Sequence, residues 1–275
     1  KEIFSFSFLL IISSLISTIT RYIYNFFIGP RYSAQDLGYY GQAFKFHQIP
    51  YNVITSTITG VSYPVFSSLN NDKERQMLYI QKIMRITAFI TFPVMIGLYC
   101  IVPNFISVIL TDKWMPMLPY FKILILAGIA MPFISLNLNI FNAIGKPRIY
   151  FSMEFLRNGL IIALLFILNS SIEVMLYGYL IATYTTLIIS SIQLQRHINY
   201  NVMEQTAHIL PSLILALVMG TTVSTIEDKL IMSDTMQLIL QLGIGGFTYI
   251  ALAWGLRLEI MNDVIEMITK KLKTK

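Results

Sequence analysis

The sequence is poor in charged residues. Only 12% of its 275 residues are Asp, Glu, Lys or Arg, whereas 55% are hydrophobic. A soluble domain usually has about twice that share of charged residues. A chain of this length therefore lacks the charged surface that would cover a core in water. The composition indicates an integral membrane protein, whose solvent is largely lipid.

Cysteine and histidine are also scarce. The single cysteine, Cys100, lies in an apolar run and has no partner for a disulfide within the chain, so we interpret it as a buried structural thiol. The three histidines are too scattered to form a metal site. The sequence has no HExxH motif, no Walker phosphate loop and no nucleophile elbow, and its paired carboxylates occur only in loops. We therefore expect a protein that is not an enzyme and that needs no cofactor.

Long apolar runs are what the sequence has instead. A helix needs roughly 20 apolar residues to cross a bilayer. Eight segments have that length, at residues 4–28, 37–66, 83–110, 117–143, 149–168, 174–194, 209–226 and 236–256. The loops between them are short, including the segments 70–76 and 227–234, and short loops join antiparallel neighbours. The sequence therefore predicts an all-α, eight-helix transmembrane bundle with no room for a soluble catalytic domain.

The basic residues predict the orientation of this bundle. One set of loops and the C-terminal tail carry most of them: Lys73, Arg75, Lys82, Arg85, Lys146, Arg148, Arg196, Arg257, Lys270, Lys271, Lys273 and Lys275. The opposite loops carry only Arg31, Lys113 and Lys229 beside several acidic residues. The positive-inside rule then places the first set and the C-terminus in the cytoplasm. We interpret the net charge of +6 as a sign of topology, and we expect no nucleic-acid partner.

The chain opens with Lys1 and enters an apolar span within a few residues. It shows no cleavage pattern of a signal peptide. We expect a fragment whose N-terminal portion is missing.

Four basic residues fall inside the predicted spans: Arg21, Lys45, Lys122 and Arg157. A charge in the bilayer core costs a few kcal/mol, so such residues usually face a water-filled cavity or a partner. Arg21 and Lys122 could instead extend their side chains to the head groups. Arg157 could pair with Glu154, which lies three residues earlier on the same helical face.

A polar stripe accompanies these charges along the second span. Its members follow one another at spacings of three or four: Gln42, Lys45, Gln48, Asn52, Thr55 and Thr59. A similar face on the first span joins Arg21 to Asn25. His47 lies off the stripe, and we interpret it as a histidine at a helix interface. A helix surrounded by lipid has no use for such a stripe, so the pattern predicts a helix that faces a water-filled cavity.

The intramembrane charges are mostly of one sign. Glu154 is the one acid well inside a predicted span. A net positive cavity favours an anion, such as a sugar phosphate or a diphosphate head group. The candidate substrate-binding residues are therefore Arg21, Asn25, Gln42, Lys45, Gln48, Asn52, Lys122 and Arg157.

The chain also resembles a known family. The run "GPRYSAQDLGYYGQAFKFHQIPYNVITSTITGVSYPVFSSLNNDKERQ" and the later runs "LTDKWMPMLPYFKILILAG" and "NAIGKPR" carry the resemblance. They are similar to the polysaccharide-exporter and O-antigen flippase branch of the multidrug/oligosaccharidyl-lipid/polysaccharide (MOP) superfamily. The similarity extends from residue 1 to about residue 196.

The resemblance implies a protein with two lobes of six helices that works by alternating access. Residues 1–198 would then form the second six-helix lobe, 199–256 an additional helix pair, and 257–275 a basic amphipathic tail on the cytoplasmic surface. The N-terminal lobe of the same chain would be the missing portion.

The function that the resemblance implies is translocation of an undecaprenyl-diphosphate-linked oligosaccharide across the bacterial cytoplasmic (inner) membrane, for O-antigen, capsule or exopolysaccharide synthesis. Lys45 and Arg21 would hold the diphosphate. The expected partners are lipid-linked oligosaccharide, membrane lipids, and the polysaccharide polymerase and export machinery. Tyr24 departs from the family pattern, because many relatives have an acid there, and this weakens the case for ion coupling through that position.

Three other functions stay open. Efflux of small organic solutes, as in the related MATE transporters, would favour intramembrane acids, whereas this chain has bases. A membrane glycosyltransferase or polymer ligase would need catalytic residues on a sizeable outer loop, and the predicted outer loops are short. A structural subunit would have no need of the polar stripe.

Overall fold

The computed structural model describes residues 2–68, 72–229, 232–258 and 260, and these residues form helices and short turns without a strand. The eight long helices are α1 (Glu2–Arg31), α2 (Ala34–Ser68), α3 (Lys73–Phe105), α4 (Leu118–Ala143), α5 (Pro147–Ile167), α6 (Ile172–Ile198), α7 (Val202–Lys229) and α8 (Asp234–Gly255). A π-helical turn, η1 (Ile106–Leu110), and a 3-10 turn, η2 (Asp112–Met117), join α3 to α4. The predicted all-α, eight-helix fold is confirmed.

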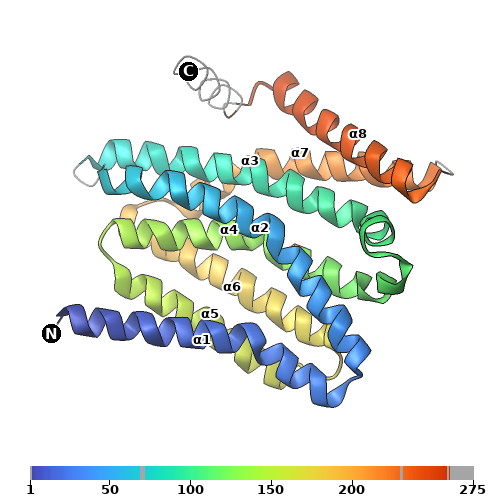
Figure 1. Cartoon of the computed structure of the whole chain (residues 1–275). Helices are drawn as coiled ribbons and strands as arrows, with labels where there is room; N and C mark the ends of the chain where they lie inside the picture. The colour runs from blue at the N-terminus through green and yellow to red at the C-terminus, as the bar shows by residue number, and fades with distance from the viewer. Residues whose placement is uncertain (1, 69–71, 230–231, 259, 261–275) are drawn as a thin grey trace, which may run out of the picture.

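Helix α4 is the centre of the bundle. Helices α2, α3 and α6 pack against it, α5 lies between α6 and α1, and α7 lies along α3 with α8 beside it (Figure 1). In the span that contains α4, 72% of the residues in the most apolar 18-residue stretch are buried. The corresponding share is 44% or less in each of the other candidate spans. Because α4 carries apolar residues on every side, it can be surrounded by other helices, whereas the remaining helices leave one side exposed.

Seven of the eight helices are long and apolar enough to cross a membrane by length and composition. Helix α2 falls short of this criterion because its polar stripe lowers its hydropathy. It nevertheless contains 35 residues, which span about 50 Å at 1.5 Å per residue. It lies against α4 for much of its length (Figure 1). Packing against apolar neighbours therefore holds α2 within the bundle.

The loops are shorter than the sequence suggested. The segment 70–76, predicted to be a loop, is helical from Lys73 onward, and the Asp72 side chain caps this helix by accepting a hydrogen bond from the Arg75 backbone N–H at 3.1 Å. Likewise α7 continues to Lys229, into the segment 227–234 that was also predicted to be a loop. The prediction was wrong here because a charged residue ends a hydrophobic run without ending the helix, which can project beyond the hydrocarbon.

The turn between α4 and α5 reverses the direction of the chain. The Lys146 N–H donates to the Phe141 carbonyl at 2.8 Å, and the Gly145 N–H donates to the Asn142 carbonyl at 3.1 Å. This is a Schellman arrangement, which needs a left-handed residue after the helix. Gly145 takes this left-handed conformation, with a φ of 73°. The conformation has little energetic cost for glycine because glycine lacks a Cβ atom.

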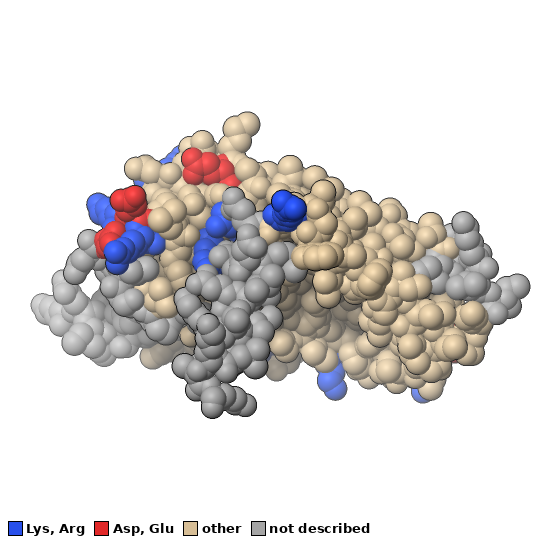
Figure 2. Space-filling view, turned by 90° about the horizontal axis from the view of Figure 1, so that it is seen from above, with Lys and Arg blue, Asp and Glu red and all other residues tan. Residues whose placement is uncertain are grey.

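One face of the bundle shows most of its charged side chains towards one end (Figure 2). Figure 2 shows most of the visible Lys, Arg, Asp and Glu side chains towards the end at which α4 joins α5, beside a broad surface without charge. The turn from α6 to α7 lies at the same end (Figure 1). The assignment of this end to the cytoplasm stays a prediction. The predicted tail 257–275 lies almost entirely outside the described residues.

Candidate functional site

A polar cavity of about 260 Å³ lies between α1, α2, α4, α5 and α6. Its lining combines hydroxyl, amide, phenol and charged groups: Ser17, Thr20, Arg21, Tyr24, Phe44, Gln48, Tyr51, Thr55, Met131, Ser135, Leu138, Asn139, Tyr150, Glu154, Arg157, Asn158, Ile161 and Tyr179. Such a concentration of polar groups among apolar spans is costly in lipid and indicates a site that holds water or a polar ligand.

Two of the predicted cations face this cavity. Arg21 comes from α1 and has an exposed side chain, while Arg157 comes from α5 and has a side chain that is 20% exposed. Glu154 is the one carboxylate among the described lining residues. The lining therefore has a net positive charge, as the sequence predicted for the cavity.

A hydrogen-bonded network connects α1 to α5 at the cavity wall. Arg157 Nη2 donates to Glu154 Oε2 at 3.0 Å, so the ion pair expected from their spacing is present. Ser17 Oγ donates to the same carboxylate oxygen at 3.2 Å and accepts from Asn158 Nδ2 at 3.2 Å. The network fixes the Glu154 carboxylate at the cavity wall.

Helix α2 contributes one face to the cavity. Phe44, Gln48, Tyr51 and Thr55 all line it, and successive members lie three or four residues apart. At 100° per residue they occupy a narrow sector of the helix. This sector includes Gln48 and Thr55 of the predicted stripe.

Other members of the stripe lie outside this sector. Lys45 and Asn52 have exposed side chains, rotated by roughly a quarter turn from the cavity face at 100° per residue. Gln42 is half-buried and lies further round the helix. None of these three residues is among the cavity lining. The predicted stripe is therefore spread over two adjoining sectors of α2, one in the cavity and one on the exposed surface of the bundle.

Asn25 and Lys122 also lie outside the lining. Asn25 is exposed on α1, one helical turn after Arg21. The Lys122 ammonium group lies 5.2 Å from the centre of the Tyr99 ring, on the side of α4 that meets α3. A cation–π contact of this kind stabilises a charge without a ligand.

Tyr24, the residue that departs from the family pattern, is buried at the cavity wall. Its hydroxyl donates to the Met175 carbonyl of α6 at 3.2 Å. Its ring stacks on Tyr40 at 5.7 Å between centroids and meets Tyr179 edge-on at 6.2 Å. An apolar contact between α1, α2 and α6 thus occupies the position where an acid would carry charge.

Two polar residues near the cavity join helices. His47 of α2 is fully buried next to Gly128 of α4, and its Nδ1 lies 2.6 Å from the Phe44 carbonyl oxygen of its own helix. Asn137 Nδ2 of α4 donates to Ser190 Oγ of α6 at 3.0 Å. The placement of His47 agrees with its interpretation as an interface residue, and Asn137 joins α4 to α6.

Sequence reasoning missed several lining residues. Tyr51 could have been found, because it lies three residues after Gln48 and four before Thr55 on one helical face. Tyr150 could also have been found, because it lies four residues before Glu154. Tyr179 was missed although Thr183 follows it four residues later on α6, and helix packing brings it to the cavity.

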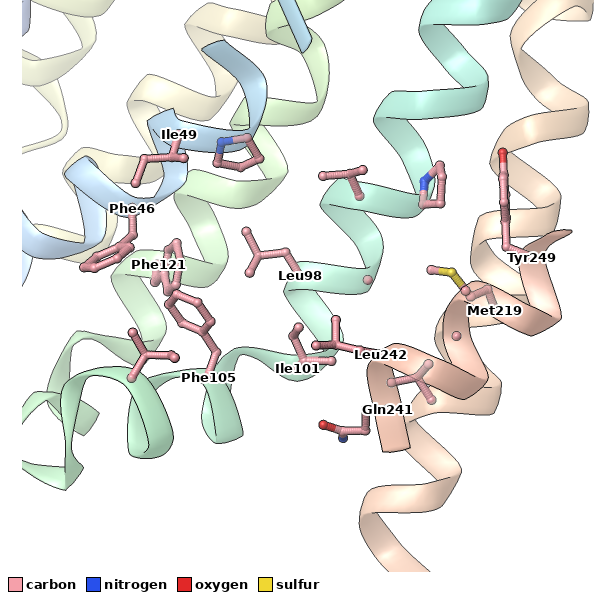
Figure 3. A pocket seen from close by; sticks show the side chains of 18 of the residues that line it. Phe46, Ile49, Leu98, Ile101, Phe105, Phe121, Met219, Gln241, Leu242 and Tyr249 are labelled. Carbon is pink, nitrogen blue, oxygen red and sulfur yellow. The ribbon is translucent and has the colours of Figure 1, made fainter. Parts of the chain in front are cut away.

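An apolar groove of about 700 Å³ lies on the other side of α2. Figure 3 shows Phe46 and Ile49 of α2 facing Leu98, Ile101 and Phe105 of α3, with Leu242 and Tyr249 of α8 on the far wall. The glycines Gly97, Gly245 and Gly246 leave room along its length. The exposed sector with Lys45 and Asn52 thus lies between the polar cavity and this groove.

Part of the chain is similar to known polysaccharide biosynthesis proteins. Residues 1–119 match the family model described as "Polysaccharide biosynthesis protein". The chain is 26% identical over 151 residues to the teichuronic acid biosynthesis protein TuaB of Bacillus subtilis (strain 168), which covers 55% of this chain and 31% of TuaB. It is 30% identical over 98 residues to the succinoglycan biosynthesis transport protein ExoT of Rhizobium meliloti (strain 1021), which covers 35% of this chain and 20% of ExoT.

A solved structure gives the fold. The chain matches lipid II flippase MurJ in its inward closed conformation with a TM-score of 0.70 and 18% identity, over 88% of this chain and 51% of MurJ. The aligned region thus spans less than a third of each curated relative and about half of MurJ. Residues 1–119 are thus similar to the polysaccharide biosynthesis family, and the helices share the fold of MurJ over 88% of this chain.

Proposed function

We propose that this protein translocates a lipid-linked (undecaprenyl-diphosphate) oligosaccharide across the bacterial inner membrane by alternating access. The observation that carries the proposal is the polar cavity with Arg21 and Arg157 in its wall, enclosed by apolar helices. Guanidinium groups bind phosphate oxygens through charge-assisted hydrogen bonds. The hydroxyl, amide and phenol groups beside them can bind the hydroxyl groups of sugars.

The faces of α2 suit a substrate with three chemical parts. The cavity sector, with Gln48 and Tyr51, suits sugar or water, and the apolar groove next to Ile49 suits a hydrocarbon chain. Lys45 and Asn52 lie on the exposed sector between them. A diphosphate joins the sugar to the prenyl chain in such a lipid, so we assign it to Lys45 and Arg21, with Asn25, Gln42 and Arg157 as further candidates.

The names of the relatives support this class of substrate. ExoT is described as a transport protein for succinoglycan biosynthesis, TuaB as a protein of teichuronic acid biosynthesis, and MurJ as a lipid II flippase. We therefore propose transport of glycan intermediates without catalysis. The N-terminal lobe of the same chain, membrane lipids and the polymerase and export machinery are its proposed partners, and its C-terminus is proposed to face the cytoplasm.

Efflux of organic cations is less well supported by the cavity. A cation site needs an available carboxylate. The one carboxylate among the described lining residues, Glu154, is already engaged by Arg157 and Ser17.

The test is made in the host organism. The gene is deleted, and lipid-linked glycan in the inner leaflet and polymer at the cell surface are measured after complementation. We expect the wild type to restore export and Lys45→Ala or Arg21→Ala to reduce it by about tenfold or more, because each loses a charge-assisted contact with phosphate.

The exposed Lys113→Ala is the matched control, because Lys113 is a lysine outside the cavity. Membrane levels of each variant should equal those of the wild type, since Lys45 and Arg21 have exposed side chains. Wild-type export by both variants would refute the site. Normal surface polymer after deletion, in a host without a second copy, would favour efflux of small solutes.

A further inference from the structure

Three polar side chains are linked in series where α1 packs against α5. On α5, Glu154 and Asn158 lie four residues apart and share a helical face. On α1, Ser17 lies four residues before Arg21, and both line the polar cavity. Because α1 and α5 are neighbours, Ser17 comes within hydrogen-bond distance of both Glu154 and Asn158. A residue of α1 therefore contacts the side chains that surround a cation of α5.

The direction of the Ser17 hydroxyl group is fixed by its two partners. An amide nitrogen can only donate a hydrogen bond, and a carboxylate oxygen can only accept one. The Asn158 amide therefore donates to Ser17 Oγ at 3.2 Å, and the Ser17 hydroxyl proton points to Glu154 Oε2, also at 3.2 Å. Asn158 is 3% exposed and Glu154 is 8% exposed, and groups buried in this way need hydrogen-bond partners. Ser17 thus brings a donor from α1 to the Glu154 carboxylate.

The hydrogen bond from Ser17 reaches the same carboxylate oxygen that Arg157 uses. Arg157 Nη2 donates to Glu154 Oε2 at 3.0 Å, and among the described residues this is the one hydrogen bond between the two side chains. Arginine and carboxylate groups frequently form two parallel hydrogen bonds instead. Since Ser17 and Arg157 share one oxygen, the carboxylate is held in an orientation that engages a single guanidinium nitrogen. The other N–H groups of Arg157, of the five in a guanidinium, stay available to the cavity.

We propose that Ser17 is a positioning residue of the anion site, whose hydroxyl group holds the Glu154 carboxylate so that Arg157 keeps donors free for a substrate phosphate. Without this hydrogen bond the carboxylate turns and takes a second N–H group of Arg157, in competition with the phosphate. The role rests on the proposed function, because it requires the cavity to bind a diphosphate. Lys45 and Arg21 are the main ligands of that diphosphate, so loss of the Ser17 hydroxyl should weaken binding without abolishing it.

The test measures binding of a diphosphate. The intact protein in lipid nanodiscs is titrated calorimetrically with P1,P2-dimethyl diphosphate, which has neither a sugar nor a prenyl chain. We expect Ser17→Ala to lower the affinity by about three- to tenfold, the effect of one hydrogen bond. Ser17→Thr keeps the hydroxyl group and should bind as the wild type does. Ser14→Ala is the matched control, because Ser14 is an exposed serine of α1 that donates to the Ile11 carbonyl of its own helix and lies outside the cavity lining.

A double-mutant cycle separates positioning from a structural effect. Arg157→Gln should still bind the diphosphate through Lys45 and Arg21. In this background Ser17→Ala should change the affinity by less than about twofold, because Ser17 acts through Arg157. Its effect on thermal stability should persist in both backgrounds, because Asn158 loses an acceptor in each. Ser17→Cys replaces Ser17→Ala where the latter does not fold, since a thiol is a weaker donor of similar size, and it should lower the affinity by at least about twofold.

The outcomes separate this inference from the proposed function. Unchanged affinity of a folded Ser17→Ala or Ser17→Cys variant would overturn the positioning role and leave the anion site intact. An equal loss of affinity in the wild-type and Arg157→Gln backgrounds would do the same, because Ser17 would then act on the whole cavity. Failure of the wild type to bind the diphosphate would overturn the anion site and, with it, this inference.

Discussion

At the scale of single residues, similar side chains take different roles because of the helix face on which they lie. Arg21 and Arg157 reach the polar cavity, whereas Lys122 lies over the ring of Tyr99. The same distinction applies to two asparagines of α4. Asn139 lines the cavity and donates to Thr59 of α2 at 2.9 Å, while Asn137 faces α6. The helix face on which an asparagine lies therefore separates the cavity residue from the residue that joins helices.

The two asparagines give a matched pair of substitutions. We expect Asn137→Ala to lower thermal stability slightly, by about 1 kcal/mol or less, because an interhelical hydrogen bond in a membrane contributes about that much. Export should be unchanged. Asn139→Ala should reduce export, because a cavity amide is lost, with a similar or smaller effect on stability. Thermal unfolding in detergent and the export assay check both, and reduced export by Asn137→Ala alone would contradict this division.

At the scale of helices, close packing depends on small residues where α7 meets α3. Gly220 of α7 is buried against Ile96 and Cys100 of α3, and an added Cβ would lie 3.0 Å from Ile96 Cγ2 and 3.2 Å from Cys100 Sγ. The Cys100 thiol also donates to the Gly220 carbonyl at 3.6 Å. Glycine therefore lets the two backbones approach, which is how helices associate where lipid removes the hydrophobic driving force.

Gly220→Val should force α7 away from α3. We expect the free energy of unfolding to fall by about 1–3 kcal/mol, as in other overpacked interfaces. Fluorescence-detected size-exclusion chromatography should then show a melting temperature several degrees lower. Gly243→Val is the control, because a Cβ at Gly243 would meet nothing within 4 Å. Equal stability of the two variants would show that α7 does not pack as described.

At the scale of the whole molecule, the exposed polar surface of α1 and α2 needs a covering that lipid does not give. Arg21 and Asn25 on α1, and Lys45 and Asn52 on α2, have exposed side chains in this bundle. Lipid is a poor solvent for them. The chain spans about half of MurJ. We therefore expect a further protein surface to cover these side chains.

The orientation of the bundle can be tested by labelling. The sequence has one cysteine, so Cys100→Ala gives a cysteine-free background. Lys113 and Lys146, on opposite sides of the predicted topology, are both exposed. In spheroplasts a membrane-impermeant maleimide should label Lys113→Cys directly and Lys146→Cys only after permeabilisation. The reverse pattern would invert the topology derived from the positive-inside rule.

The sequence by itself determined the eight helices, because runs of apolar residues must form internally hydrogen-bonded segments in lipid. It also predicted that Arg157 could pair with Glu154, because residues three apart share a helical face. Helix ends were less well predicted, as the helical start at Lys73 shows, because hydropathy reports the hydrocarbon boundary and not the last hydrogen bond.

Only the tertiary structure decided which polar residues share a cavity. It joined Ser17 to Glu154 across 137 positions of sequence and brought Tyr179 beside Tyr24. It also divided the stripe of α2, placing Gln48 in the cavity and Lys45 on the exposed surface. Periodicity within one helix gives the angle between its side chains, but the neighbour that each side chain meets depends on how the helices pack, and no single helix carries that information.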